Sequence, residues 1–224
     1  MHIFNSLFAL FYREYKINCR DFTDILSVLL FFFLGILIFV FSIGPNSDIF
    51  NKINIGIIWT LLLFSNNLSL KKFFQNDFDD GSLILFHMSG ISLEIIVLIK
   101  LIIMWVFFQL PFIIIIPIAG ILLNIKTDNI SLIILTFLIG SPILTSITSI
   151  SGSMNLLNKK NFTIGSLIIM VFSIPVIIFS VGIINVSEEL IKAQLNILTG
   201  ILLLFLAITP WISAACIKLA LQNK

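Results

Sequence analysis

The sequence predicts an all-α membrane protein with six transmembrane helices, and three observations lead to this expectation. Hydrophobic residues fill 59% of the 224 positions, the mean hydropathy is +1.16, and only 11% of the residues are charged. A soluble domain usually carries about 25% charged residues. The apolar residues also gather in six runs that reach or approach the roughly 17–25 residues of a membrane-spanning helix. We therefore expect a single membrane domain over residues 1–224.

The six predicted spans follow one another with short connections, at residues 25–43, 53–70, 95–123, 130–150, 162–184 and 195–219. The second is the least apolar, because Asn66 and Asn67 lie near its end. The third contains Lys100, whose long side chain is expected to extend to the nearby membrane surface. Four prolines are expected to kink or break these helices: Pro111, Pro117, Pro142 and Pro175.

Basic residues are distributed unevenly between the two sides of the predicted membrane. Nine lie on the side of the N-terminus: Arg13, Lys16, Arg20, Lys71, Lys72, Lys159, Lys160, Lys218 and Lys224. Three lie on the opposite side: Lys52, Lys126 and Lys192. Lysine and arginine in short loops favour the cytoplasmic side. Both termini are therefore expected in the cytoplasm of a bacterial inner membrane, or in the equivalent compartment of a mitochondrial inner membrane.

Residues 3–16 precede the first span and fit an amphipathic helix better than a signal peptide. A signal peptide carries its basic residues before its apolar region, but here the first basic residue is Arg13. Apolar residues recur at helical spacing before it: Phe4, Leu7, Phe8 and Phe11. We expect an interfacial helix on the membrane surface. A simple N-terminal extension of the first span is the alternative.

The sequence contains no familiar catalytic or nucleotide-binding motif, since GxxxxGKS/T, HExxH and GxSxG are all absent. His87 is more typical of a surface histidine than of a metal or haem ligand, because no second ligand is evident. Cys19 and Cys216 lie in unrelated contexts and predict no disulfide framework. The net charge of +2 gives no reason to expect nucleic acid as a partner. The chain is thus expected not to be an enzyme and to bind no cofactor or metal directly.

Lys100 is the sole charged residue one or two turns inside a predicted span, and Lys218 lies at the end of the sixth. Glu94 is the acidic residue closest to a span interior, which argues against a carrier driven by protons. The segment GSPILTSITSISGSM, residues 140–154, covers the second half of the fourth span and the four residues after it. Small residues allow helix backbones to approach closely. Close packing is therefore the favoured interpretation of this segment, and a substrate pathway is the alternative.

An acidic segment, FFQNDFDDGSLILF at residues 73–86, lies between the second and third spans. Counted from Asp77, Gly81 falls one place too early for a calcium-binding EF-hand loop. The apolar run that follows Ser82 predicts a short interfacial helix, capped by Asp79, Asp80 or Ser82 itself. A rigid element of this kind suits a membrane subunit that receives force from a soluble motor. An ordinary charged turn is the alternative.

Six stretches resemble the haem exporter protein B (CcmB) family of cytochrome c maturation, in the same order and over nearly the whole chain. They are FYREYKINCRD (11–21), GIIWTLLLFSNNLSLKKFFQNDFDDGSLILF (56–86), KLIIMWVFFQLPFIIIIPIAG (100–120), GSPILTSITSISGSM (140–154), IPVIIFSVG (174–182) and ITPWISAACIKLAL (208–221). The chain departs from the family pattern at Ile84, where a glutamate is usual, and at Ser141, where a threonine is usual.

The resemblance implies an ABC-type exporter permease for haem handling in cytochrome c biogenesis. It would work with an ATPase subunit (CcmA), haem-handling subunits (CcmC and CcmD) and a haem chaperone (CcmE), and it could form a homodimer. The partner subunits would then handle haem and ATP. The expected ATPase-facing residues are Asp77, Asp80, Gly81, Leu83, Arg13 and Glu14. The alternatives are an exporter permease for another hydrophobic cargo and a membrane scaffold that transports nothing.

Overall fold

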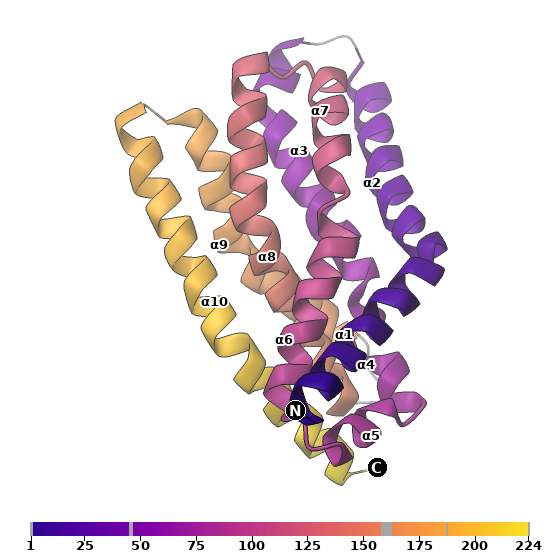
Figure 1. The fold of residues 1–224 in the computed structure, drawn as a ribbon. Helices are drawn as coiled ribbons and strands as arrows, with labels where there is room; N and C mark the ends of the chain where they lie inside the picture. Colours follow the sequence, from indigo (N-terminus) through magenta and orange to yellow (C-terminus); the bar gives the residue numbers. More distant parts are fainter. Residues whose placement is uncertain (1, 45–46, 158–162, 187, 224) are drawn as a thin grey trace.

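The computed structural model describes residues 2–44, 47–157, 163–186 and 188–223, and these residues form helices joined by short turns. The helices are α1 (His2–Arg20), α2 (Phe22–Ile43), α3 (Ser47–Leu68), α4 (Leu70–Asp79), α5 (Ser82–Met88), α6 (Leu93–Met104), a π-helical turn η1 (Trp105–Gln109), α7 (Phe112–Leu122), α8 (Thr127–Leu157), α9 (Thr163–Asn185) and α10 (Glu188–Gln222). Figure 1 shows an elongated bundle in which α4, α5 and both chain termini gather at one end, which we call the terminal end.

Six segments of the described chain are long and apolar enough to cross a membrane, which confirms the predicted number of spans. They are Phe22–Ile43, Lys52–Asp79, Leu93–Leu122, Asn129–Leu157, Ile164–Ile184 and Glu189–Gln222. The last helix begins at Glu188, earlier than the predicted start at residue 195. The predicted start of the fifth span, residue 162, and the basic pair Lys159 and Lys160 lie outside the described residues.

The second span continues past its predicted end as a separate helix, α4. Helix α3 ends at Leu68, and the Ser69 hydroxyl donates a 2.7 Å hydrogen bond to the carbonyl of Asn66 at the junction. The buried residues of α4 recur at spacings of three and four: Leu70, Phe73, Phe74, Asp77 and Phe78. This periodicity buries one face of the helix while its Lys, Gln and Asn residues face outward. The acidic segment therefore begins as an amphipathic helix, not as a loop.

The third span is broken at Leu110 and Pro111, as its first proline suggested. The N–H of Leu110 bonds to the carbonyl of Trp105 at 3.1 Å, which is the wider spacing of a π-helical turn. Pro111 has no N–H to continue the ladder, and α7 begins after it. The prolines at 117, 142 and 175 lie inside continuous helices, so the expectation of a break does not hold there.

Helix α8 lies at the centre of the bundle, in contact with α3, α4, α6, α7, α9 and α10. A Cβ atom added to Gly140 would lie 2.5 Å from the Trp59 ring, and one added to Gly152 would lie 3.3 Å from the Leu70 carbonyl oxygen. The hydroxyls of Thr145 and others nearby donate to carbonyls of α8 itself. These contacts confirm that the small residues allow close helix packing.

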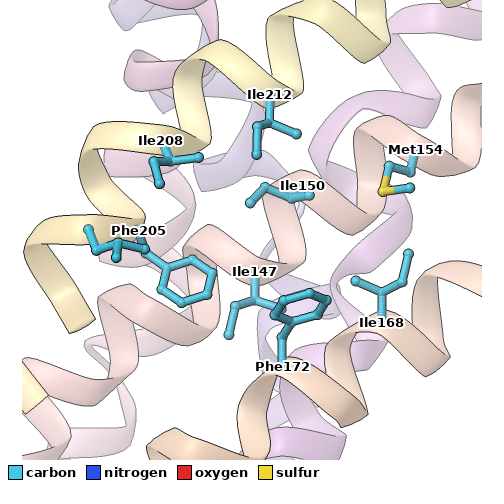
Figure 2. A pocket seen from close by; sticks show the side chains of 9 residues that line it. Ile147, Ile150, Met154, Ile168, Phe172, Phe205, Ile208 and Ile212 are labelled. Atoms are coloured by element: carbon cyan, nitrogen blue, oxygen red, sulfur yellow. The ribbon is translucent and has the colours of Figure 1, made fainter.

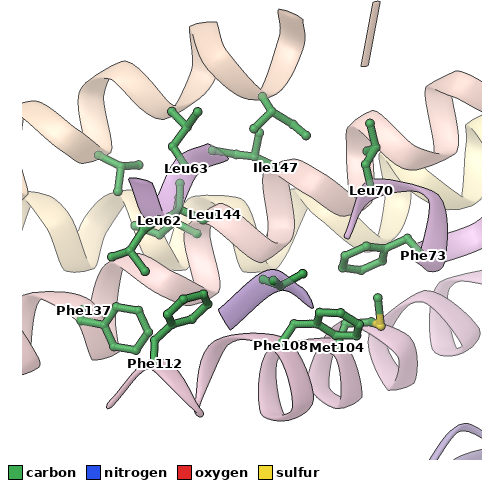
Figure 3. Packing of buried hydrophobic residues seen from close by; sticks show 14 of the residues in the cluster. Leu62, Leu63, Leu70, Phe73, Met104, Phe108, Phe112, Phe137, Leu144 and Ile147 are labelled. Atoms are coloured by element: carbon green, nitrogen blue, oxygen red, sulfur yellow. The ribbon is translucent and has the colours of Figure 1, made fainter. Parts of the chain in front are cut away.

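Aromatic and aliphatic side chains fill the space between α3, α4, η1, α7 and α8, as Figure 3 shows. Phe112 contacts Phe32 and Phe137 edge to face, with ring centroids 5.0 and 6.4 Å apart. A separate apolar cavity of 470 Å³ lies between α8, α9 and α10, and Figure 2 shows its lining. Residues such as Ile150, Phe172 and Ile208 line this cavity. It lies apart from the polar residues considered next.

Candidate functional site

Helix α1 turns a polar stripe toward the bundle and an aromatic face away from it. Leu10, Glu14 and Asn18 are buried at a spacing of four, and Asn18 donates a 2.9 Å hydrogen bond to the Glu14 carbonyl. Large apolar side chains are exposed on other faces of the helix: Phe8, Phe11, Tyr12 and Tyr15. This arrangement agrees with the predicted amphipathic helix, because an aromatic face suits the membrane interface. Arg13 and Glu14 are therefore directed at the other helices, whereas Lys16 and Arg20 are exposed.

Lys100 of α6 is the centre of a charge cluster, and the expectation that it reaches the membrane surface is wrong. Its side chain is only 3% exposed. Its ammonium group lies 3.0 Å from the Glu14 carboxylate of α1 and also pairs with the Asp77 carboxylate of α4. Two nearby carboxylates offset the cost of burying the ammonium ion, so the side chain has no need to reach water. Lys100 thus joins three helices.

Arg13 completes this cluster from the same turn of α1 as Glu14. Its guanidinium donates to Glu14 at 2.6 Å and to Asp77 at 2.9 Å, and it lies 4.9 Å from the centre of the Phe86 ring. Partial burial opposes its charge, but the hydrogen bond and charge of Asp77, supported by the other carboxylates, raise the pKa of Arg13 above its ordinary value. Two cations thus face the two buried carboxylates, and the more exposed Asp80 carboxylate lies 4.0 Å from Arg13.

Asp80, Gly81 and Ser82 form the turn that joins α4 to α5. Gly81 has a φ of +80°, a left-handed conformation that a glycine adopts without strain. The Asp80 carboxylate accepts from the Ser82 N–H at 2.8 Å and from its hydroxyl at 2.6 Å. Partial burial works against ionisation, but these bonds and the charges of Arg13 and Lys100 lower the pKa of Asp80. The N-cap position of α5 is Gly81, so none of the three predicted caps occupies it, and Asp80 instead binds the first N–H of the helix from the preceding residue.

Helix α5 packs against the rest of the protein on one side and exposes an apolar face on the other. Leu83 is fully buried, whereas Ile84, Leu85 and Met88 are exposed. The structure thus brings Arg13, Glu14, Asp77 and Asp80 together and places Gly81 and Leu83 beside them. Asp77 and Leu83 are covered by this chain itself, so an external partner would meet the outer face of α5 instead. His87 is exposed on the same helix, as expected for a surface histidine.

The sequence matches known proteins over almost its full length. The profile described as CcmB protein matches residues 5–220. The chain belongs to the CcmB family. It is 32% identical to the heme exporter protein B of Haemophilus influenzae over 94% of this chain and 96% of that protein. It is 27% identical to the proteins of the same name from Pseudomonas aeruginosa and Escherichia coli K12, with at least 95% of each chain covered.

This CcmB-family chain also contains an amide network inside its spans that sequence reasoning did not identify. Asn66 donates to the Leu144 carbonyl at 2.9 Å and to the Thr148 hydroxyl at 2.6 Å. Gln109 of η1 donates to the Asn66 side-chain oxygen at 2.7 Å. Buried amides in a membrane must find such partners, because hydrocarbon offers none. The network fixes the end of α3, and hence the start of α4, against α8 and the third span.

Two signals in the sequence of this CcmB-family chain could have pointed to the charge cluster. Lys100 is a cation inside a span, and a buried cation requires carboxylate partners. Glu14 falls four residues after Leu10, on the same helical face. If Leu10 is taken to pack against the bundle, this spacing places a carboxylate on the packed face. What the sequence does not reveal is that α1 and α4 lie close enough to α6 to share one ammonium group.

Proposed function

We propose that this chain is the transmembrane permease subunit of an ATP-driven haem-handling complex in cytochrome c biogenesis. In this proposal a separate ATPase subunit (CcmA) docks on α5, and its motion is transmitted to the spans. The complex includes the haem-handling subunits CcmC and CcmD and drives release of the haem-loaded chaperone CcmE. Membership of the CcmB family and the name of the relatives, heme exporter protein B, support this function.

The observation that carries the proposal is the linkage of α5 to the spans. Arg13 donates to Ser82 at 3.1 Å and to Asp77 at 2.9 Å, and Asp77 pairs with Lys100 inside the third span. A displacement of α5 would therefore be transmitted to α6 through the contacts of Arg13, Asp77 and Lys100. The exposed Leu85 and Met88 offer the apolar contact that a docking partner needs at the centre of its interface.

The same proposal places α5 and both termini in the cytoplasm, where ATP is available. The bias of lysine and arginine toward the terminal end supports this orientation. Glu14 and Asp77 act inside the chain in this account, and Asp80 shapes the docking turn. Ile84, where family members usually carry a glutamate, is 37% exposed on the docking helix. A partner of this chain is expected to present an apolar group there.

The test is co-purification with the ATPase subunit, measured together with the yield of cytochrome c. Leu85→Asp places a charge in the centre of the proposed docking face, and Asp80→Lys reverses a charge beside it. Both variants should lose most of the bound ATPase and most of the cytochrome c. Gln222→Asp adds the same carboxylate at an exposed position of the terminal end and should behave as the wild type. Wild-type binding by both docking variants would refute the docking role.

A membrane scaffold that transports nothing is separated from the permease by a second measurement. The purified ATPase subunit is assayed with and without this chain in reconstituted membranes. A coupled permease is expected to change the rate of ATP hydrolysis, and Lys100→Met is expected to reduce that change. A scaffold leaves the rate unaltered even when the two subunits bind each other.

A further inference from the structure

A second cavity, of 520 Å³, opens beside the junction of α3 and α4. Phe31 of α2 with Phe64 and Leu68 of α3 form its apolar walls. Asn67 of α3, Lys71 of α4 and Ser166 of α9 supply its polar groups. Its volume falls within the roughly 300–1,000 Å³ of small-molecule pockets. The described residues that line the cavity of Figure 2 are all apolar, whereas this cavity has both apolar and polar lining residues.

The polar part of this cavity lies beside the charged start of α2, where we place the membrane surface. Lys72, next to Lys71, bonds to Asp21 at 3.2 Å and also pairs with Asp24, at the start of α2. After Asp24, no charged residue occurs in the rest of α2. The pairs therefore align the first turn of α4 with the point at which α2 enters the apolar layer. Lys71 is exposed at that depth.

The apolar part lies deeper and faces the surrounding lipid. Phe31, Phe64 and Leu68 are 41%, 39% and 53% exposed, so their side chains line a groove that is open from the side. The amide oxygen of Asn67 accepts a 3.0 Å hydrogen bond from the Ser166 hydroxyl, which joins α3 to α9 at the boundary between the two parts. The cavity thus changes from apolar to cationic along the direction in which a lipid molecule changes from chain to headgroup.

We propose that this cavity binds an anionic glycerophospholipid from the membrane leaflet at the terminal end of the bundle. The phosphate group pairs with the Lys71 ammonium ion, and one acyl chain lies along Phe31, Phe64 and Leu68. Basic pockets between transmembrane helices are a known form of recognition for anionic headgroups. Lys72 does not line this cavity and instead pairs with Asp21 and Asp24. The site is independent of the ATPase-docking role of α5.

Haem is the other anionic amphiphile to consider, and the lining of this cavity favours the lipid. Protein sites that hold haem iron use histidine, cysteine, methionine or tyrosine side chains. The described residues that line this cavity include none of these four types. The lipid needs only a cation at the surface and an apolar wall below it, and both are present.

The experiment is native mass spectrometry of the full chain released from nanodiscs that contain equal amounts of phosphatidylglycerol and phosphatidylcholine. The wild type should retain phosphatidylglycerol in preference. Lys71→Gln should weaken that retention about fivefold, the effect of one basic residue near the surface. Lys218→Gln removes an exposed lysine elsewhere at the terminal end and should change nothing. Leu68→Trp, which fills the apolar wall, should reduce the retention of both lipids.

Three outcomes would overturn the proposal. The first is equal retention of phosphatidylglycerol by the Lys71→Gln and Lys218→Gln variants, with both proteins shown to be folded by their melting temperatures. The second is saturable haem binding, followed by its absorption band, that Leu68→Trp abolishes, since haem would then be the occupant. The third is a dimer in the mass spectrum that Leu68→Trp dissociates without any change in bound lipid, since a second copy would then cover this face.

Discussion

Replacing Lys100 with methionine should destabilise the protein more than any other change of a single lysine. Methionine keeps most of the volume and removes the ammonium group, which leaves Glu14 and Asp77 buried with Arg13 as their only cation among the contacts described. Removing one member of a buried ion pair costs about 3–5 kcal/mol. Because Arg13 still contacts both carboxylates, we expect the lower end of that range, about 3 kcal/mol.

The assay is unfolding of the purified chain in detergent micelles by added SDS, followed by tryptophan fluorescence. Lys126→Met serves as the matched control, since Lys126 is exposed at the opposite end of the bundle. The double variant Lys100→Met with Glu14→Gln removes one cation and one buried carboxylate together, which leaves Arg13 with Asp77 and the more exposed Asp80, and it should recover more than half of the loss. If Lys100→Met unfolds like the Lys126→Met control, Lys100 is not held as a buried ion pair and the reasoning fails.

Three further predictions test other contacts. Gly152→Val should lower the free energy of unfolding by about 1–3 kcal/mol, because the new side chain meets the Leu70 carbonyl oxygen, whereas Gly200→Val enters open space and should cost far less. Gln109→Leu should cost about 0.6–2 kcal/mol in the same assay, and a double-mutant cycle with Asn66→Leu should show that the two amides are coupled. Since the pKa of Asp80 is lowered on folding, its contribution to stability is present above pH 4, approximately, and is lost as the pH falls further. An SDS titration repeated at several pH values should show this loss in the wild type and a smaller one in Asp80→Asn.

The six spans could be predicted from the sequence because each is a long apolar run, and a bilayer tolerates little else. Helix α4 could not be predicted in this way, because its lysines, glutamine and aspartates lower the mean hydropathy of the segment even though one face of the helix is apolar. Its register emerges only when Phe73, Phe74 and Phe78 are assigned to one side. The core against which that side packs is supplied by α8, which comes much later in the chain.

Four residues of the charge cluster were selected from the sequence, but the buried position of Lys100 was not. Arg13, Glu14, Asp77 and Asp80 were selected from two separate segments, and the structure places them within one cluster. Lys100 was assigned to the membrane surface because a long side chain can usually reach water at low cost. That argument considers one helix at a time. Ion pairing across helices is a property of their arrangement, which the sequence does not display.

The position of Lys100 in the chain has a consequence for biosynthesis. A lysine that enters a bilayer alone costs about 2.5–3.5 kcal/mol at the centre of a span and less near its end, where Lys100 lies. Glu14 and Asp77 both precede Lys100, so the ribosome has already made α1 and α4 when α6 emerges. Each carboxylate can remain solvated by water at the membrane surface until α6, with Lys100, has been synthesised. The order of synthesis thus supplies the counter-ions before the charge that needs them, and no intermediate has to bury Lys100 alone.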